Sequence, residues 1–175
     1  DHPKYYSKAL NSKATTIIIN TDEVECPEGK ALIVHDNPLD AFNKLILSYR
    51  RFEPATAMIG PKAEIGEGTI IEPGVFVGDR VKIGKNCIIH PNVTIYNHVI
   101  IGDNVIIQSG SVIGGDACYF QRRPEGFVKF ESCGRVIIED DVEIGACCCV
   151  DIGVTSDTIV GKGTKMDNFV QIGHD

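Results

Sequence analysis

The sequence lacks several features that mark common functional classes. It has no run of basic residues and carries a formal net charge of −7, which argues against a nucleic-acid-binding role. It also has no apolar stretch of transmembrane length and no secretory signal within its 175 residues. We therefore expect neither a nucleic-acid partner nor a transmembrane segment.

Patterns of metal ligands are missing as well. None of the seven cysteines forms a Cys-x-x-Cys pair with a second pair at zinc spacing. A catalytic zinc needs three protein ligands that converge on one point, and His90 and His98 occupy different places in the repeat described below. We expect no metal site, and we interpret the cysteines as reduced core and corner residues of a cytosolic protein.

What the sequence does contain is an aliphatic residue at every sixth position, without a miss, from Ile59 to Ile113. A period of six fits neither a 3.6-residue helix nor one long strand, and it is typical of a parallel β-helix built from hexapeptide repeats. Glycine often follows the repeated residue, as at Gly66 and Gly84, where we expect it to supply the backbone angles of a sharp corner. Ten aliphatic residues carry the period: Ile59, Ile65, Ile71, Val77, Ile83, Ile89, Ile95, Ile101, Ile107 and Ile113.

The period is interrupted twice. An aromatic and charged excursion occupies residues 119–136, and a four-residue extra follows around Gly153–Ser156. The repeat resumes after each break, at Ile138 and at Val160. Insertions in a solenoid emerge as loops that often lie on the binding face, although a tolerated surface loop is the simpler alternative.

The first part of the chain has a different sequence pattern from the hexapeptide repeat. Residues 1–53 predict a small α/β module, and residues 54–175 predict the β-helix. Lys13–Ile19 and Lys30–Val34 are the expected strands of the module, because they are short apolar runs bounded by turn-rich segments. Asn37 is the expected cap of a helix that begins at Pro38.

His174 is the candidate catalytic residue that the repeat singles out. It stands two positions after Ile172, at or just past a corner, and it should face outward. If each coil contains three hexads and the four-residue extra is looped out, Ile152 lies directly beneath His174 in the stack. Histidine is the commonest general base, and an ordinary surface histidine is the alternative.

Four stretches of the sequence resemble one family of hexapeptide acyltransferases. They are HPKYYSKALNSKATTIII (His2–Ile19), NVTIYNHVIIGDNVIIQSGSVIGGDA (Asn92–Ala117), GRVIIEDDVEIGACCCVDIG (Gly134–Gly153) and MDNFVQIGHD (Met166–Asp175). In this order they are similar to the UDP-3-O-(3-hydroxyacyl)glucosamine N-acyltransferases of lipid A biosynthesis. The resemblance implies a left-handed parallel β-helix, preceded by a uridine-binding module, in a homotrimer with active sites between subunits. It also implies a chain truncated at both ends, without the family's C-terminal coils and helical region.

The same resemblance assigns roles to five residues. His174 stands where the family has its general base, and Tyr5 stands where a tyrosine stacks on the uracil ring. His2 falls where the family usually has an asparagine that contacts the nucleotide. Asp167 and Asn168 match an acidic-amide pair that we expect to line the sugar end of the cleft.

The implied reaction moves a 3-hydroxyacyl chain from acyl carrier protein to the 2-amine of UDP-3-O-(3-hydroxyacyl)glucosamine. We expect no bound cofactor, because the phosphopantetheine arrives on the carrier protein. The expected location is the cytoplasm of a Gram-negative bacterium, with peripheral association with the inner membrane as an alternative. Two other functions stay open: a different hexapeptide transferase that acts on a sugar nucleotide with acyl- or acetyl-CoA, and a non-catalytic β-helix scaffold.

Overall fold

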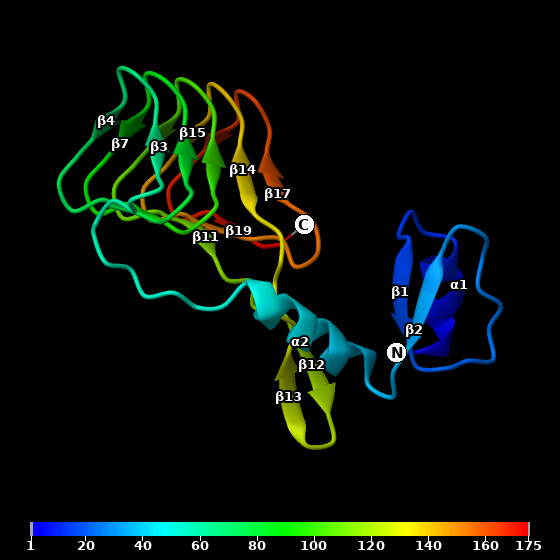
Figure 1. Cartoon of the computed structure of the whole chain (residues 1–175). Coiled ribbons are helices and arrows are strands. Elements are labelled where there is room, and N and C mark those ends of the chain that lie inside the picture. Colours follow the sequence, from blue (N-terminus) through cyan, green and yellow to red (C-terminus); the bar gives the residue numbers. More distant parts are fainter. Residues whose placement is uncertain (1, 175) are drawn as a thin grey trace. The chain divides into compact units, whose positions relative to one another are not determined.

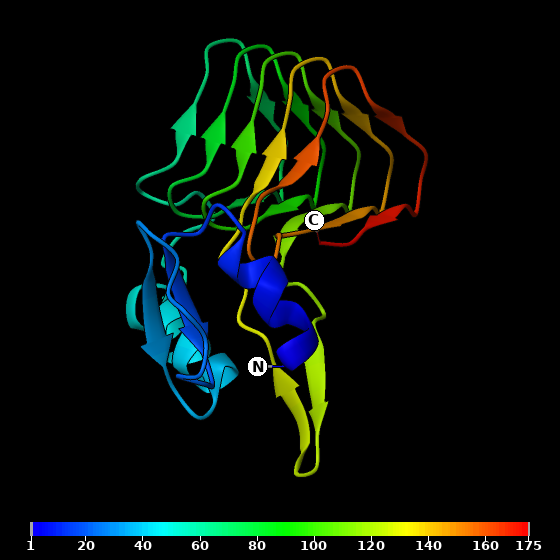
Figure 2. The same cartoon turned by 90° about the vertical axis from the view of Figure 1, so that its right-hand side faces the viewer.

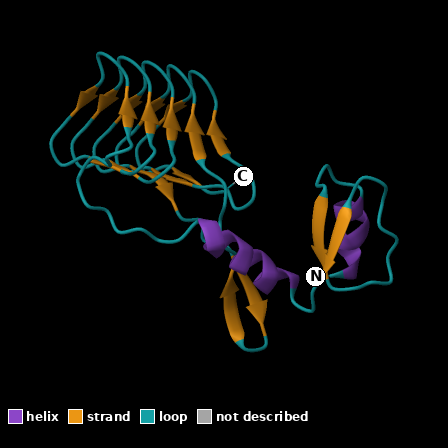
Figure 3. Ribbon diagram, in the orientation of Figure 1, coloured by secondary structure: helices purple, strands orange, loops and turns teal. Residues whose placement is uncertain are grey.

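Most of the chain forms stacked coils that contain short parallel strands (Figures 1 and 3). The computed structural model describes residues 2–174. The chain divides into two compact units, with the boundary between Arg51 and Phe52. The helices belong to the N-terminal unit, whereas the stack of strands and its large buried cluster belong to the second unit.

The N-terminal unit combines a two-stranded parallel sheet with helices. Its elements are η1 (Pro3–Tyr5), α1 (Tyr6–Leu10), β1 (Thr16–Ile19), β2 (Ala31–Val34) and α2 (Pro38–Tyr49). Ile19 of β1 is buried, as are Leu39 and Ile46 of α2, which packs against β1. Helix α2 begins where the sequence predicts, because the Asn37 side chain accepts a hydrogen bond from the Asp40 amide at 3.2 Å. No helix within residues 2–174 is long and apolar enough to cross a membrane.

The second unit is a parallel β-helix whose coils stack along three sheets. Its strands are β3 (Glu64–Ile65), β4 (Ile70–Ile71), β5 (Phe76–Val77), β6 (Lys82–Ile83), β7 (Ile88–Ile89), β8 (Thr94–Ile95), β9 (Ile100–Ile101), β10 (Ile106–Ile107), β11 (Val112–Gly115), β14 (Val136–Ile138), β15 (Glu143–Ile144), β16 (Cys149–Asp151), β17 (Thr158–Val160), β18 (Lys165–Met166) and β19 (Gln171–Ile172). The sheets have the strand orders β17-β14-β9-β6-β3, β18-β15-β10-β7-β4 and β19-β16-β11-β8-β5, so each coil adds one strand to each sheet. This confirms the predicted solenoid.

Stacking places the six-spaced aliphatic residues in columns inside the β-helix. Ile89, Ile107 and Ile144 stand one above another in register and are fully buried. Each such side chain contributes roughly 1.5–3 kcal/mol to stability. Ile59 and Ile65 depart from the pattern, with 44% and 39% of their surface exposed, because they lie at the open end of the stack and only one neighbouring coil covers them.

The glycines that follow the aliphatic residues do not all have the expected role: Gly114 has a positive φ of 85°, as a corner residue should, but others do not. Gly66 and Gly84 do not have positive φ, whereas Asn86 and Asn104 occupy left-handed corner positions with φ of 54° and 58°. A Cβ added to Gly66 would lie 2.5 Å from the carbonyl group of Gly84 in the next coil. The expectation about corner angles is therefore wrong at these two glycines, which are required because the backbone of the next coil approaches so closely.

Acidic side chains tie successive coils together at one corner. Asp140 Oδ1 accepts the Asp103 amide hydrogen at 3.0 Å, and Asp103 Oδ1 accepts the Lys85 amide hydrogen at 2.7 Å. Lys162 Nζ lies 3.3 Å from Asp140 Oδ2. The amide hydrogen bond from Asp103, followed by the hydrogen bond from Lys162, holds the pKa of Asp140 below its ordinary value.

Two segments leave the stack of coils. After β11, the strands β12 (Phe120–Arg123) and β13 (Gly126–Lys129) form an antiparallel hairpin that projects away from the coils (Figure 2). After β16, the chain makes a short excursion over residues 153–156 before β17 resumes the repeat. The segment 119–136, which interrupts the hexapeptide period, therefore contains a regular hairpin rather than an unstructured loop.

The column of isoleucines can be tested by shortening one side chain at its centre. Ile107→Ala should lower the free energy of unfolding by about 2–5 kcal/mol, because it leaves a cavity among fully buried side chains. Ile65→Ala, the matched change at the exposed end, should cost about 1 kcal/mol or less. Urea unfolding followed by circular dichroism measures both, and equal losses would contradict the gradient of burial along the stack.

Asp140 gives the stability of the fold a specific pH dependence. Because folding lowers its pKa, the carboxylate stabilises the folded state above its ordinary pKa, and this contribution is lost as the pH falls below about 4. Asp140→Asn keeps an acceptor for the Asp103 amide, so it should melt below wild type at about pH 7 and converge with it only once the pH has fallen below the lowered pKa of Asp140 in the folded state. Asp140→Ala also removes the acceptor and should melt below wild type both above and below that pKa. A gap for Asp140→Asn that does not change with pH would rule out the charge effect.

Candidate active site

Three successive coils contribute to one corner of the β-helix, which we call the hairpin corner. It lies at the C-terminal ends of β11, β16 and β19, which pair in register through Ile113, Val150 and Ile172. The hairpin leaves the stack after β11, the extra segment 153–156 leaves after β16, and His174 follows β19. Both irregular segments and the predicted general base therefore meet at the same edge.

The His174 side chain is partly exposed and lies against Tyr119. The two ring centroids are 5.1 Å apart and the rings are inclined at 72°, which is an edge-to-face contact. Tyr119 packs in turn on Phe130, with ring centroids 5.5 Å apart. The register of β16 and β19 pairs Val150 with Ile172, and the predicted alignment of Ile152 with His174 lies two residues beyond that last pair.

Tyr119 is not among the residues that the sequence predicts for the site. In the sequence it is only the first aromatic residue of the excursion. The sequence position of Tyr119 could have indicated its place in the site, because the residue lies where the hexapeptide period breaks after Ala117. The coil count assigns that break to the same corner as His174, so the first residues of the excursion had to lie near the histidine.

Tight packing fixes the base of the hairpin against the extra segment. A Cβ added to either Gly134 or Gly153 would come within 1.8 Å of the Ser156 carbonyl oxygen. Close by, two nitrogens of Arg135 bind the Asp157 carboxylate at 3.2 and 2.8 Å, which raises the pKa of Arg135. The hairpin corner is therefore a densely packed frame around a partly exposed histidine.

A paired lysine also anchors the hairpin to the coil. The Lys129 ammonium group forms an ion pair with Asp116 and lies 3.7 Å from Glu131. Burial lowers the pKa of Lys129, but the hydrogen bond and the charge of Asp116 outweigh that effect and raise it. Lys129 therefore ties the end of β13 to the residues that precede β12.

Asp167 and Asn168 lie at the corner that follows β18, one corner before His174 on the same coil. The Asn168 side-chain oxygen accepts the Ala146 amide hydrogen at 2.7 Å, and Asp167 Oδ1 accepts the Asn168 amide hydrogen at 2.8 Å. Asn168 thus joins two coils in the way that Asp140 does. The chain does not bring this pair to the hairpin corner.

His2 and Tyr5 lie together in the N-terminal unit. His2 caps η1 by accepting the Lys4 amide hydrogen at its Nδ1 atom, at 3.3 Å, and its ring lies 6.3 Å from that of Tyr5. The Tyr5 side chain is 54% exposed, and the Lys4 ammonium nitrogen lies 4.7 Å from its ring centroid. The two residues predicted to contact the nucleotide therefore share one short segment.

Other candidate ligands and nucleophiles are dispersed. Between residues 2 and 174, no three His, Cys, Asp or Glu side chains converge as a metal site requires. His90 Nδ1 lies 2.6 Å from Glu72 Oε2 in the next coil, and His98 occupies a left-handed corner with φ of 66°. Burial raises the pKa of the Cys87 thiol, which disfavours the nucleophilic thiolate.

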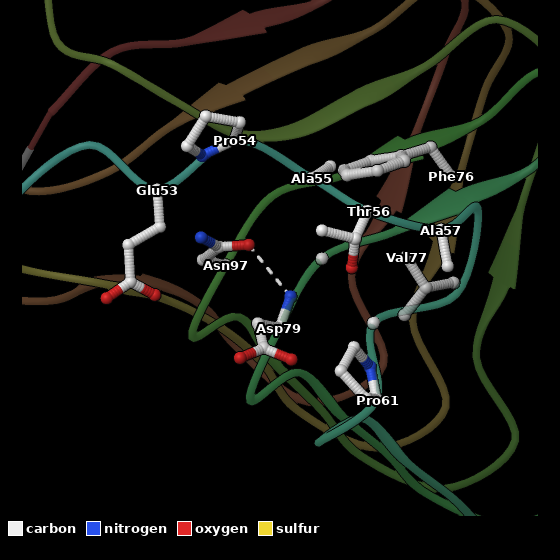
Figure 4. A pocket seen from close by; sticks show the side chains of 12 residues that line it. Glu53, Pro54, Ala55, Thr56, Ala57, Pro61, Phe76, Val77, Asp79 and Asn97 are labelled. Atoms are coloured by element: carbon white, nitrogen blue, oxygen red, sulfur yellow. Dashed lines mark hydrogen bonds between the residues drawn. The ribbon is translucent and has the colours of Figure 1, made fainter.

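A pocket of about 160 Å³ lies among the first coils of the stack, whereas the hairpin corner lies on later coils (Figure 4). The segment 53–57 forms one side of it, and Phe76, Asp79 and Asn97 line the other. The Asp79 amide donates a hydrogen bond to Asn97 Oδ1 at 2.8 Å, so these polar groups already join two coils. The pocket contains no predicted site residue, and we assign it no ligand.

Known proteins share this repeat and this fold. Residues 80–115 match the family model described as bacterial transferase hexapeptide (six repeats). A crystal structure of UDP-N-acetylglucosamine acyltransferase is similar with a TM-score of 0.57 and 30% sequence identity, over 70% of this chain and 46% of that chain. The second unit thus contains the hexapeptide repeat of this family model over residues 80–115, and the chain shares its fold in part with that acyltransferase structure.

Relatives of known name indicate which kind of acyltransferase the chain resembles. UDP-3-O-acylglucosamine N-acyltransferase from Syntrophotalea carbinolica is 41% identical over 99% of this chain and 57% of the relative. The protein of the same name from Phocaeicola vulgatus is 42% identical over the same shares, and the one from Porphyromonas gingivalis is 53% identical over 38% of this chain and 19% of the relative. The chain is therefore homologous to the UDP-3-O-acylglucosamine N-acyltransferases, as its four stretches indicated. It spans a little over half the length of the first two relatives.

Proposed function

We propose that the protein carrying this chain is an N-acyltransferase of lipid A biosynthesis. It moves a 3-hydroxyacyl chain from acyl carrier protein to the 2-amine of UDP-3-O-(3-hydroxyacyl)glucosamine. The observation that carries the proposal is the similarity to UDP-3-O-acylglucosamine N-acyltransferases over 99% of the chain. The hairpin corner supports it, because His174 is partly exposed there among segments that depart from the regular repeat.

His174 is the general base in this proposal. The amine nitrogen attacks the thioester carbonyl carbon, a C–N bond forms, and the carbonyl electron pair moves onto oxygen. A neutral imidazole accepts the proton that the amine loses. The tetrahedral intermediate then collapses, the C–S bond breaks, and the imidazolium returns a proton to the departing thiolate. The thiol belongs to the phosphopantetheine of the carrier protein, so the proposal includes no bound cofactor.

Tyr5 and His2 are the proposed contacts of the nucleotide. The exposed tyrosine ring offers a flat apolar face on which uracil can stack. Lys4 covers one face of that ring, which leaves the opposite face for the base. His2 lies edge-on beside the same ring, so an interacting nucleotide would meet both residues.

A homotrimer with sites between neighbouring subunits is part of the proposal. Asp167 and Asn168 lie one corner away from His174, so such an assembly would let the pair of one copy face the hairpin corner of the next. The proposed partners are acyl carrier protein, the UDP-3-O-acylglucosamine substrate and two further copies of the chain. The proposed location is the cytoplasm of a Gram-negative bacterium, with peripheral association with the inner membrane as the alternative.

A second candidate is another acyltransferase that acts on a sugar nucleotide. One observation favours it, since a structure named UDP-N-acetylglucosamine acyltransferase shares the fold at 30% identity. Such an enzyme would take a different acceptor or a coenzyme A donor. The exposed Tyr5 with His2 beside it favours the first candidate, because a simple sugar acetyltransferase lacks a uridine module.

An acyl-transfer assay on the natural protein that carries this chain tests the proposal. With UDP-3-O-acylglucosamine and 3-hydroxyacyl carrier protein, wild type should transfer the chain, and His174→Ala should lose about 10²–10⁴-fold in rate because the general base is gone. The matched control His90→Gln, a histidine of the same solenoid, should retain the wild-type rate. Transfer only from acetyl-CoA, or only to another sugar nucleotide, would favour the second candidate. No transfer with any donor would favour a scaffold.

A further inference from the structure

We propose that Tyr119 is the positioning residue of His174. Its ring, fixed by the base of the hairpin, holds the imidazole in the orientation that accepts a proton. This inference rests on the proposed function of His174 as general base. It adds a role for the hairpin that the hexapeptide repeat by itself does not supply.

The orientation of His174 matters for the reaction that we propose for it. The residue lies just beyond the last residue of β19 and is partly exposed. An imidazole has several staggered rotamers, and a general base needs the one that turns a ring nitrogen toward the substrate amine. A base that is wrongly oriented for part of the time catalyses proton transfer more slowly, since the reacting atoms must be aligned.

Tyr119 is well placed to restrict those rotamers. Its ring meets His174 edge-to-face at 5.1 Å, a geometry that aromatic pairs prefer over a face-to-face stack. The contact joins β19 to a segment that left the stack two coils earlier, after β11. It therefore couples the orientation of the histidine to the hairpin.

The tyrosine is itself held by its surroundings. Its amide donates to the Ala117 carbonyl at 2.9 Å, and its own carbonyl accepts the Phe130 amide hydrogen at 2.9 Å. The Phe130 ring packs on the other side of the hairpin base at 5.5 Å. The ion pair of Lys129 with Asp116 closes the same base. A Tyr119 ring that is held in this way can restrict the orientation of the neighbouring His174 ring.

The geometry distinguishes the role of the Tyr119 ring from that of its hydroxyl group. The contacts of Tyr119 with His174 and Phe130 are both ring contacts. Positioning therefore requires an aromatic ring at this place, and phenylalanine should serve as well as tyrosine. If the hydroxyl took part in the chemistry, phenylalanine would fail.

The experiment compares Tyr119→Phe and Tyr119→Leu in the natural protein. In the acyl-transfer assay, Tyr119→Leu should lower kcat about three- to tenfold with little change in KM, which is the range expected for one aromatic pair. Tyr119→Phe should restore the wild-type kcat. The control Phe127→Leu removes an aromatic ring that is 75% exposed on the distal part of the same hairpin, and it should leave kcat unchanged.

A second measurement separates this inference from the proposed function. The NMR signals of the His174 ring protons should show a ring-current shift in wild type and Tyr119→Phe, and that shift should vanish in Tyr119→Leu. Loss of the shift with an unchanged kcat would overturn the positioning role. A lowered kcat in Tyr119→Phe would overturn it too, because the hydroxyl would then matter. Absence of acyl transfer in wild type, with the shift present, would overturn the proposed function and with it the need to position a base.

Discussion

The burial of one aliphatic side chain every six residues is the constraint on which the rest of the solenoid depends. Strands of two to four residues cannot bury enough surface alone, so each coil is stable only between neighbours. Close stacking then dictates the other positions of the repeat. Gly66 and Gly84 are glycines because the backbone of the next coil passes within 3 Å of where a Cβ would stand.

The same constraint decides where a functional group can appear. The interior is filled, and an insertion within a strand would move the columns out of register. Extra residues can therefore leave the stack only at corners, and both excursions of this chain leave at the hairpin corner. The structure brings His174 to that corner from one coil and Tyr119 from another, although neither residue belongs to the repeated pattern. The regular part of the chain thus acts as a frame that carries an irregular site.

Much of this fold was predictable because its causes are local and repeated. The columns through Ile89 and Ile107 follow from a period that no helix or single strand shares, and α2 follows from an Asn37 cap before a proline. The exposure of Ile65 was not predictable from the period, because it depends on the position of a coil within the stack. The role of Gly66 was missed because the sequence shows neighbours along the chain but not the coil above.

The site was predictable only in part, for a similar physical reason. His174 could be placed by its distance from Ile172, since a regular repeat fixes which residues reach a corner. The contact with Tyr119 could not be placed in detail, because the path of an excursion is set by tertiary packing at Phe130, Gly134 and Gly153. Asn168 was expected at the substrate, but its side chain joins two coils, a use that the sequence does not distinguish from ligand binding.

The most direct test is a structure of the natural protein with UDP-3-O-acylglucosamine bound. The account predicts that the 2-amine nitrogen lies within hydrogen-bonding distance, about 2.6–3.2 Å, of a His174 ring nitrogen at the hairpin corner. The Tyr119 ring should remain edge-on to the imidazole. A glucosamine ring bound elsewhere, such as in the pocket lined by Phe76 and Asn97, would contradict the assignment of the hairpin corner as the active site.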